Sequence, residues 1–139
     1  MGFHVDTASR LPIYQQLVDQ IREAVARGDL QPEEKLPSVR QLSGELVVNP
    51  NTIARAFLEL ERAGILVSRA GRGMYVAHPG TDLSKAARNR RLAESLDRWL
   101  TEAVHLGFAA EEVVELVTRR VADFQWNADG AKGKGKTQP

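Results

Sequence analysis

The stretch of residues 36–77 constrains the fold of this chain most, because two helix starts follow each other within it and a glycine-rich hairpin comes next. Ser38, with Gln41 three residues later, forms the pattern of a capping box at a helix start. Asn49 followed by Pro50 is typical of a second helix start, since Asn caps well and Pro needs no donor in the first turn. Apolar residues recur at helical spacing after each start, so the sequence predicts two short helices joined by a tight turn.

A two-stranded ribbon is expected directly after the second helix. Gly64 is typical of a helix end, and residues 65–69 and 74–77 read as two strands around an Ala-Gly-Arg-Gly tip. Gly71 and Gly73 allow this tip to turn tightly and to approach a ligand closely. The order of helix, turn, helix and ribbon predicts a winged helix-turn-helix domain.

The second helix presents a polar face near its start, opposite its apolar stripe. Asn51, Thr52 and Arg55 lie there, where a recognition helix meets base edges in the major groove. Arg pairs with guanine and Asn with adenine, while Thr contacts a base or a phosphate. The alternative is an ordinary solvated helix face beside an ordinary hairpin. Four further residues are expected mainly to hold phosphates: Arg40, Asn49, Arg69 and Arg72.

Three sequence segments carry a resemblance to a known family. They are LPSVRQL at residues 36–42, VNPNTI at 48–53 and LERAGIL at 60–66. They resemble the DNA-binding domain of GntR-family transcriptional regulators, and the Asn-Pro-Asn-Thr turn and the short chain look most like the YtrA-type subfamily. The resemblance covers roughly residues 12–77. It implies that Arg40 contacts DNA and that the protein represses transcription.

Bulk charge gives little support to a nucleic-acid partner. The net charge is +1, and residues 1–78 carry nine basic and nine acidic side chains. Residues 38–78 alone hold five Arg against three Glu. The expectation of DNA binding therefore rests on where the arginines stand, and weak non-specific binding at physiological salt follows.

The chain is expected to divide into a DNA-binding domain at residues 1–78, a helical region at 79–126 and a disordered Gly/Lys-rich tail at 127–139. The helical region reads as a two-helix hairpin, which is too small to enclose a core alone. Each hairpin helix has a stripe of apolar residues, and a homodimer of two hairpins would bury these stripes. The alternative is a hairpin that folds back on its own DNA-binding domain. The expected interface residues are Leu92, Leu96, Trp99, Leu100, Val113, Leu116, Val117 and Val121. The same region is a candidate effector region, and a small-molecule effector of unidentified structure would sit at its junction with the DNA-binding domain.

Other sequence features argue against an enzyme, a cofactor or a metal site. The sequence has no cysteine, and its three histidines stand apart from one another. Residues 130–137 match a phosphate-binding loop pattern, but only two residues follow them, so the required helix cannot form. No segment has the length of a membrane helix or the apolar core of a signal peptide, which predicts a cytoplasmic protein without a membrane partner.

The sequence thus predicts a mainly α protein that binds double-stranded operator DNA of near-palindromic sequence as a homodimer. Two other functions stay open. One is a non-specific architectural DNA-binding protein, and the other is a winged-helix module that binds protein.

Overall fold

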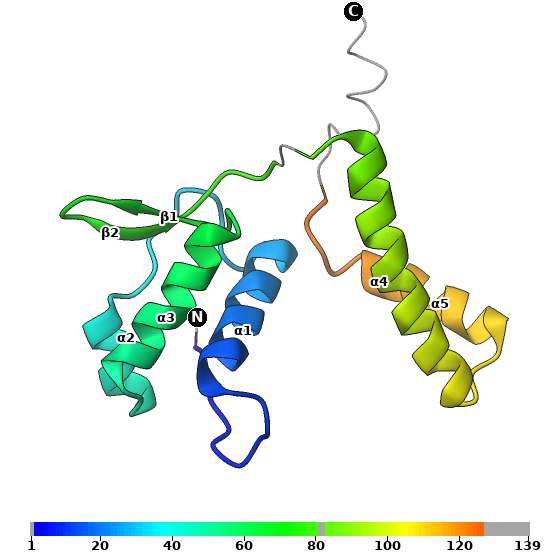
Figure 1. Ribbon diagram of the computed structural model, residues 1–139, viewed down its shortest axis with the longest axis horizontal. Helices are drawn as coiled ribbons and strands as arrows, with labels where there is room; N and C mark the ends of the chain where they lie inside the picture. The colour runs from blue at the N-terminus through cyan, green and yellow to red at the C-terminus, as the bar shows by residue number, and fades with distance from the viewer. Residues whose placement is uncertain (1, 81–82, 127–139) are drawn as a thin grey trace, which may run out of the picture. The chain divides into compact units, whose positions relative to one another are not determined.

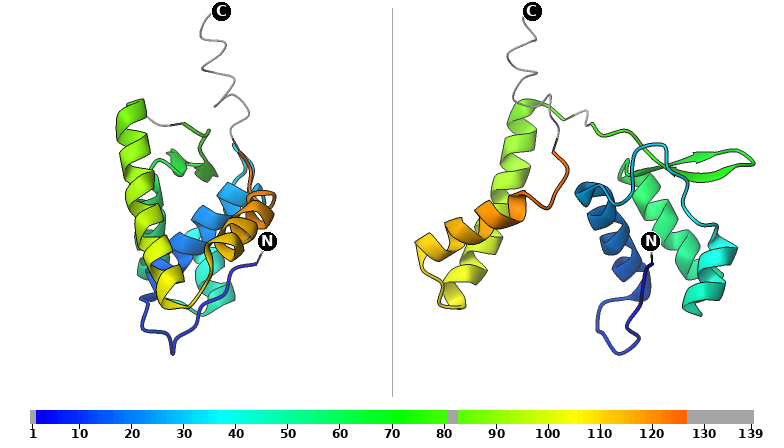
Figure 2. Two further views of the ribbon diagram at one scale, coloured as in Figure 1. Left: turned by 90° about the vertical axis from the view of Figure 1, so that its right-hand side faces the viewer. Right: turned by 180° about the vertical axis from the view of Figure 1, so that it is seen from behind.

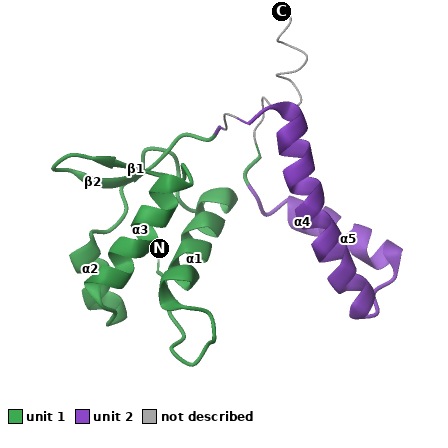
Figure 3. Ribbon diagram, viewed as in Figure 1, with its two compact units in different colours: residues 1–79, 125–139 green, residues 80–124 purple. Residues whose placement is uncertain are grey.

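The computed structural model describes residues 2–80 and 83–126, and its contacts divide the chain into two compact units. The first unit contains the described residues up to Pro79 together with Gln125 and Trp126. The second unit contains Gly80–Phe124. Figure 3 colours the two units separately.

Three helices and a two-stranded sheet form the first unit (Figure 1). The helices are α1 (Ile13–Arg27), α2 (Val39–Leu46) and α3 (Pro50–Arg62). Helix α3 packs against both α1 and α2, and the right-hand view of Figure 2 shows it between them. The apolar stripes of all three helices meet in one core, which contains Leu17, Val18, Ile21, Ala24, Leu30, Leu36, Leu42, Val48, Ile53, Ala56, Phe57, Leu60, Leu66 and Val76.

The sheet is a short antiparallel ribbon that projects from the helices (Figure 1). Strand β1 is Leu66–Arg69 and strand β2 is Gly73–Val76, with Leu66 paired to Val76 and Arg69 to Gly73. The strands therefore begin one residue later and one residue earlier, respectively, than the sequence indicated. The Ile65 N–H instead bonds to the Leu60 carbonyl at the end of α3. The prediction of a mainly α fold with a small β wing is confirmed.

The loop after α1 lies along the free edge of β2, which the sequence did not indicate. Its backbone makes three hydrogen bonds of 2.8 Å to this strand: Glu33 N–H to the Val76 carbonyl, Val76 N–H to the Glu34 carbonyl, and Leu36 N–H to the Met74 carbonyl. The loop contains two prolines and several charged residues, which are not typical of a strand, so its sequence did not predict this pairing. Strand β2 is therefore hydrogen-bonded along both of its edges, to β1 on one side and to this loop on the other.

The helix starts follow the local chemistry with one correction. The Ser38 hydroxyl accepts the Gln41 N–H at 3.0 Å, as expected for an N-cap. The Gln41 side chain does not return to Ser38, because its amide donates to Glu45 at 3.2 Å instead. The capping box is therefore only half formed. The turn into α3 passes through Val47 in the left-handed region, at φ 55°.

The second unit is a pair of helices, α4 (Lys85–His105) and α5 (Ala110–Val121). The Ser84 hydroxyl accepts the Ala87 N–H at the start of α4. The Glu112 carboxylate accepts the Ala109 N–H at 2.8 Å at the start of α5. Ala103 is the one buried hydrophobic residue among those described in this unit, so the pair leaves most of its apolar surface open.

Candidate nucleic-acid interface

The start of α3 has one buried face and one face that is open to solvent. The buried residues Ile53, Ala56, Phe57 and Leu60 fix the inner face of the helix. Asn51 and Arg55 are exposed on the outer face, and Thr52 is half-buried at its edge. The structure therefore places these three predicted residues together at one helix start. Donors in this position can pair with base edges or with a phosphate at the helix N-terminus.

Asn49 is held by its role as N-cap of α3. Its side-chain oxygen accepts the Asn51 N–H at 2.8 Å. That oxygen is satisfied, so only the side-chain amide N–H groups can donate to a phosphate. Capping and a phosphate contact would therefore use different atoms of one side chain.

The Arg55 side chain does not extend freely into solvent. Its guanidinium carbon lies 3.7 Å from the centroid of the Tyr14 ring, which α1 supplies. A guanidinium stacked on an aromatic face gains about 0.5–1 kcal/mol at an exposed site and loses rotamer freedom. The sequence gives no signal for this contact, because only the packing of α1 against α3 brings the two side chains together.

The wing holds two predicted arginines in different surroundings. Arg72 is exposed at the tip, where its N–H bonds to the Arg69 carbonyl at 2.8 Å and Gly71 adopts φ 73°. Arg69 at the end of β1 lies against the Tyr75 ring, 4.5 Å from its centroid, and pairs with a carboxylate of Glu33 at 2.6 Å. Gly73 adopts φ 110°, and a side chain there would meet the end of Lys35. The tip therefore depends on both glycines.

Arg40 lies in the first turn of α2 and is exposed. Among the residues that the structure describes, neither Arg40 nor Arg72 makes an ion pair or a side-chain hydrogen bond. Both side chains can therefore turn to a phosphate without breaking an internal contact.

Glu33 is a site residue that sequence reasoning missed. The Arg69 guanidinium beside its carboxylate, followed by the His78 ring at 2.7 Å, holds the pKa of Glu33 below its usual value. The carboxylate is therefore ionised at neutral pH and neutralises a wing arginine. Only the pairing of the loop with β2 brings these residues together, so the sequence carried no signal for it.

Most of the predicted interface residues of the hairpin lie on its open surface. Leu92, Leu96, Trp99 and Leu100 on α4 are between 37% and 72% exposed. On α5, Val113 and Leu116 are half-buried, while Val117 and Val121 are exposed. The hairpin also holds a cavity of about 160 Å³, which is lined by Trp99, Glu102, Ala103, Leu106, Phe108, Val113 and Leu116. This volume is below that of a usual ligand pocket.

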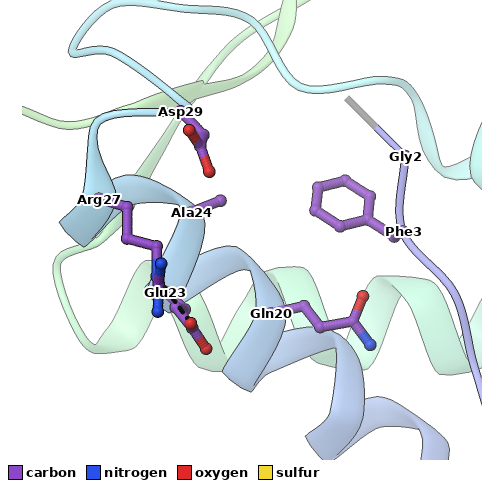
Figure 4. Close-up of a pocket in the computed structure, with 7 residues that line it drawn as sticks. All are labelled: Gly2, Phe3, Gln20, Glu23, Ala24, Arg27 and Asp29. Atoms are coloured by element: carbon purple, nitrogen blue, oxygen red, sulfur yellow. Dashed lines mark ion pairs between the residues drawn. The ribbon is translucent and has the colours of Figure 1, made fainter. Parts of the chain in front are cut away.

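A larger cavity of about 390 Å³ lies beside α1 in the first unit (Figure 4). Three of the polar side chains that line it already have partners within the protein. Arg27 pairs with Glu23 at 2.8 Å, and the Gln20 side chain exchanges two hydrogen bonds with the backbone of His4. These three side chains therefore need no ligand to satisfy them.

Metal sites, membrane helices and the C-terminal tail were also considered in the sequence. Within residues 2–80 and 83–126, no group of three or more His, Cys, Asp or Glu side chains could hold a metal ion. No helix in that same part of the chain has the length and apolar character needed to cross a membrane. The Gly/Lys-rich tail and the phosphate-loop pattern at residues 130–137 lie outside the described residues.

Known proteins with similar sequences indicate the family of this chain. The sequence model of the family described as bacterial regulatory proteins, gntR family, matches residues 13–76, which span α1 to the end of the wing. The HTH-type transcriptional repressor YtrA of Bacillus subtilis is 34% identical over 121 residues, which cover 87% of this chain and 93% of YtrA.

Two solved structures are similar as well. A transcriptional antiterminator from Listeria monocytogenes is 34% identical with a TM-score of 0.72, over 87% of this chain and 90% of that one. The DNA-binding domain of AraR in complex with operator ORX1 is 29% identical with a TM-score of 0.50, over 54% of this chain and 95% of that one. The match to YtrA over nearly its whole length, together with the winged helix-turn-helix geometry, shows that the chain belongs to the gntR family of bacterial regulatory proteins.

Proposed function

We propose that the protein is a sequence-specific repressor that binds a near-palindromic operator as a homodimer. The observation that carries this proposal is the exposed start of α3, where Asn51, Thr52 and Arg55 stand together beside a wing with basic residues. The AraR DNA-binding domain, which has a similar fold, is seen with operator DNA. The YtrA relative is named a repressor. In this proposal α3 enters the major groove, and Arg40, Asn49, Arg69 and Arg72 hold phosphates.

Selection of bound sites from random DNA tests sequence-specific binding directly. We expect one motif with two half-sites whose centres are about 34 Å apart, or a multiple of that distance, since two recognition helices must meet successive turns of DNA. Each wrong base pair should then weaken binding by about 1–3 kcal/mol. Equal binding to all sequences would indicate an architectural protein instead. An absence of binding would favour a module that recognises protein.

The open face of the hairpin supports the homodimer. Several large apolar residues on α4 are more than a third exposed, although such residues are usually covered in a stable fold. A second copy presents the same stripe, and two hairpins together can form a four-helix arrangement that covers both. Sedimentation at micromolar concentration should therefore show a dimer.

Repression and effector control are separate parts of the proposal. A dimer seated on a promoter would block transcription, and transcription in vitro from a promoter that carries the selected site should fall as protein is added. The protein would act in the cytoplasm, where its DNA lies. The cavity within one hairpin is smaller than the ~300–1,000 Å³ of usual ligand pockets, so we expect no tight effector held entirely by a single hairpin. Thermal-shift screening against metabolites would contradict this if it found such a ligand there.

Asn49 provides a test that separates helix stability from DNA contact. Asn49→Ala should lower the free energy of unfolding by about 1 kcal/mol, because the Asn51 N–H loses its acceptor. Asn49→Asp keeps the acceptor and suits the helix dipole, so stability should be retained. It replaces the amide donor by a negative charge, so DNA binding should weaken.

Thermal unfolding and DNA titration on the same samples measure these two effects. If Asn49→Asp binds DNA as well as the parent protein, then Asn49 acts only as a helix cap.

A further inference from the structure

Glu33 is held in a conformation that a side chain rarely adopts. Its φ is 74°, in the left-handed region that usually favours glycine. The Glu33 N–H is fixed to the Val76 carbonyl at 2.8 Å, so the pairing of the loop with β2 maintains this conformation. Strained residues of this kind persist where the surrounding structure fixes them, and they gather at functional sites.

The Glu33 carboxylate stands at the base of the wing with two cationic or polar neighbours. Arg69 donates to one carboxylate oxygen at 2.6 Å, and the His78 Nε2 lies 2.7 Å from the other oxygen. The side chains of Arg69 and Glu33 remain 38% and 49% exposed. The pair is therefore within reach of a ligand that approaches the wing from solvent.

A carboxylate and a DNA phosphate compete for the same part of an arginine. Both offer two oxygens to the planar guanidinium, and Arg binds either in the same geometry. Arg69 also rests on the Tyr75 ring, which limits how far it can turn to serve both partners. Exposed ion pairs contribute little to stability, so a phosphate can displace Glu33, but DNA binding loses the energy of the broken pair.

We propose that Glu33 is an affinity-determining residue that occupies Arg69 in place of a DNA phosphate and so weakens binding to all DNA sequences. This proposal rests on the proposed contact between the wing and DNA. Phosphate contacts carry no sequence information, so Glu33 lowers affinity for operator and random DNA alike and leaves their ratio unchanged.

Glu33→Gln tests the proposal, because glutamine has the same size and loses the charge. We expect this variant to bind both the selected site and scrambled DNA about two- to fivefold more tightly at low salt. Glu34→Gln is the matched control, since it makes the same charge change one residue away, where the carboxylate accepts the Gln31 N–H instead of an arginine. It should change binding much less. Glu33→Gly removes the carboxylate and suits the positive φ, so it should give the same gain as Glu33→Gln.

A double-mutant cycle with Arg69→Ala identifies the partner. Arg69→Ala alone should weaken binding to both DNAs. When Arg69→Ala is already present, Glu33→Gln should raise the DNA affinity by no more than Glu34→Gln does. The proposal is overturned if Glu33→Gln binds no more tightly than the control, or if its gain persists without Arg69. Weaker binding by Glu33→Gln would also overturn it, since Glu33 would then hold Arg69 ready for DNA. If the parent protein selects a DNA motif but one of these contradicting results is found, the proposed operator binding is retained and only the proposed role of Glu33 is wrong.

Discussion

Leu96→Glu is expected to convert the protein from a dimer to a monomer at micromolar concentration. Leu96 is 48% exposed on α4 of a single chain, so a glutamate there stays hydrated in the monomer. In a dimer that covers this face, an uncompensated buried charge costs about 3–5 kcal/mol. Symmetry buries two of them, so the dimer should dissociate more than about a hundredfold more readily. Sedimentation measures the change directly.

Operator binding should fall with the dimer. Two linked half-site contacts gain affinity because the second contact is intramolecular, and a monomer loses that advantage. Thr101→Glu is the control, because five residues along α4 place its side chain well away from the Leu96 stripe. It should leave both the dimer and DNA binding intact. A parent protein that is monomeric yet binds a two-half-site operator with full affinity would refute the hairpin interface.

Arg55→Ala is expected to weaken binding to the selected site by about 1–3 kcal/mol and binding to scrambled DNA much less. The physical reason is that a guanidinium that pairs with guanine distinguishes that base from the others, whereas a phosphate contact does not. Arg62→Ala is the matched control, since it removes the same charge from the last turn of the same helix, where Arg62 lies 3.8 Å from Glu59. Titration of both variants on both DNAs gives the comparison.

Tyr14 extends this test to the residue that supports Arg55. Tyr14→Phe keeps the ring beneath the guanidinium and should bind as the parent does. Tyr14→Ala removes the ring and should weaken binding to the selected site by about 0.5–1 kcal/mol. This is part of the loss in binding free energy expected for Arg55→Ala. Equal losses by Arg55→Ala on selected and scrambled DNA would mean that Arg55 packs on Tyr14 or holds a phosphate and does not read a base.

Local chemistry was enough to predict most of the first unit. Ser38 and Asn49 cap α2 and α3 as expected, because a capping bond joins residues only two or three apart and can be read from the sequence. Gly71 and Gly73 mark the wing tip, since positive φ is cheap only for glycine. The apolar residues at helical spacing in α2 and α3 pack in the core, because burial follows helical periodicity. The half-formed capping box shows the limit, since Gln41 had a second partner one turn away.

The partners of the candidate DNA-binding side chains were decided only by the tertiary structure. Arg55 meets Tyr14 because α1 packs against α3, and Arg69 meets Glu33 because a loop with no strand pattern pairs with β2. A long charged side chain can reach many neighbours, and no periodicity records which of them folding brings near. The sequence by itself therefore determined the helices, the turn and the wing, through contacts between near neighbours. The fold determined which arginines already have a partner within the protein, through contacts between residues far apart in the chain.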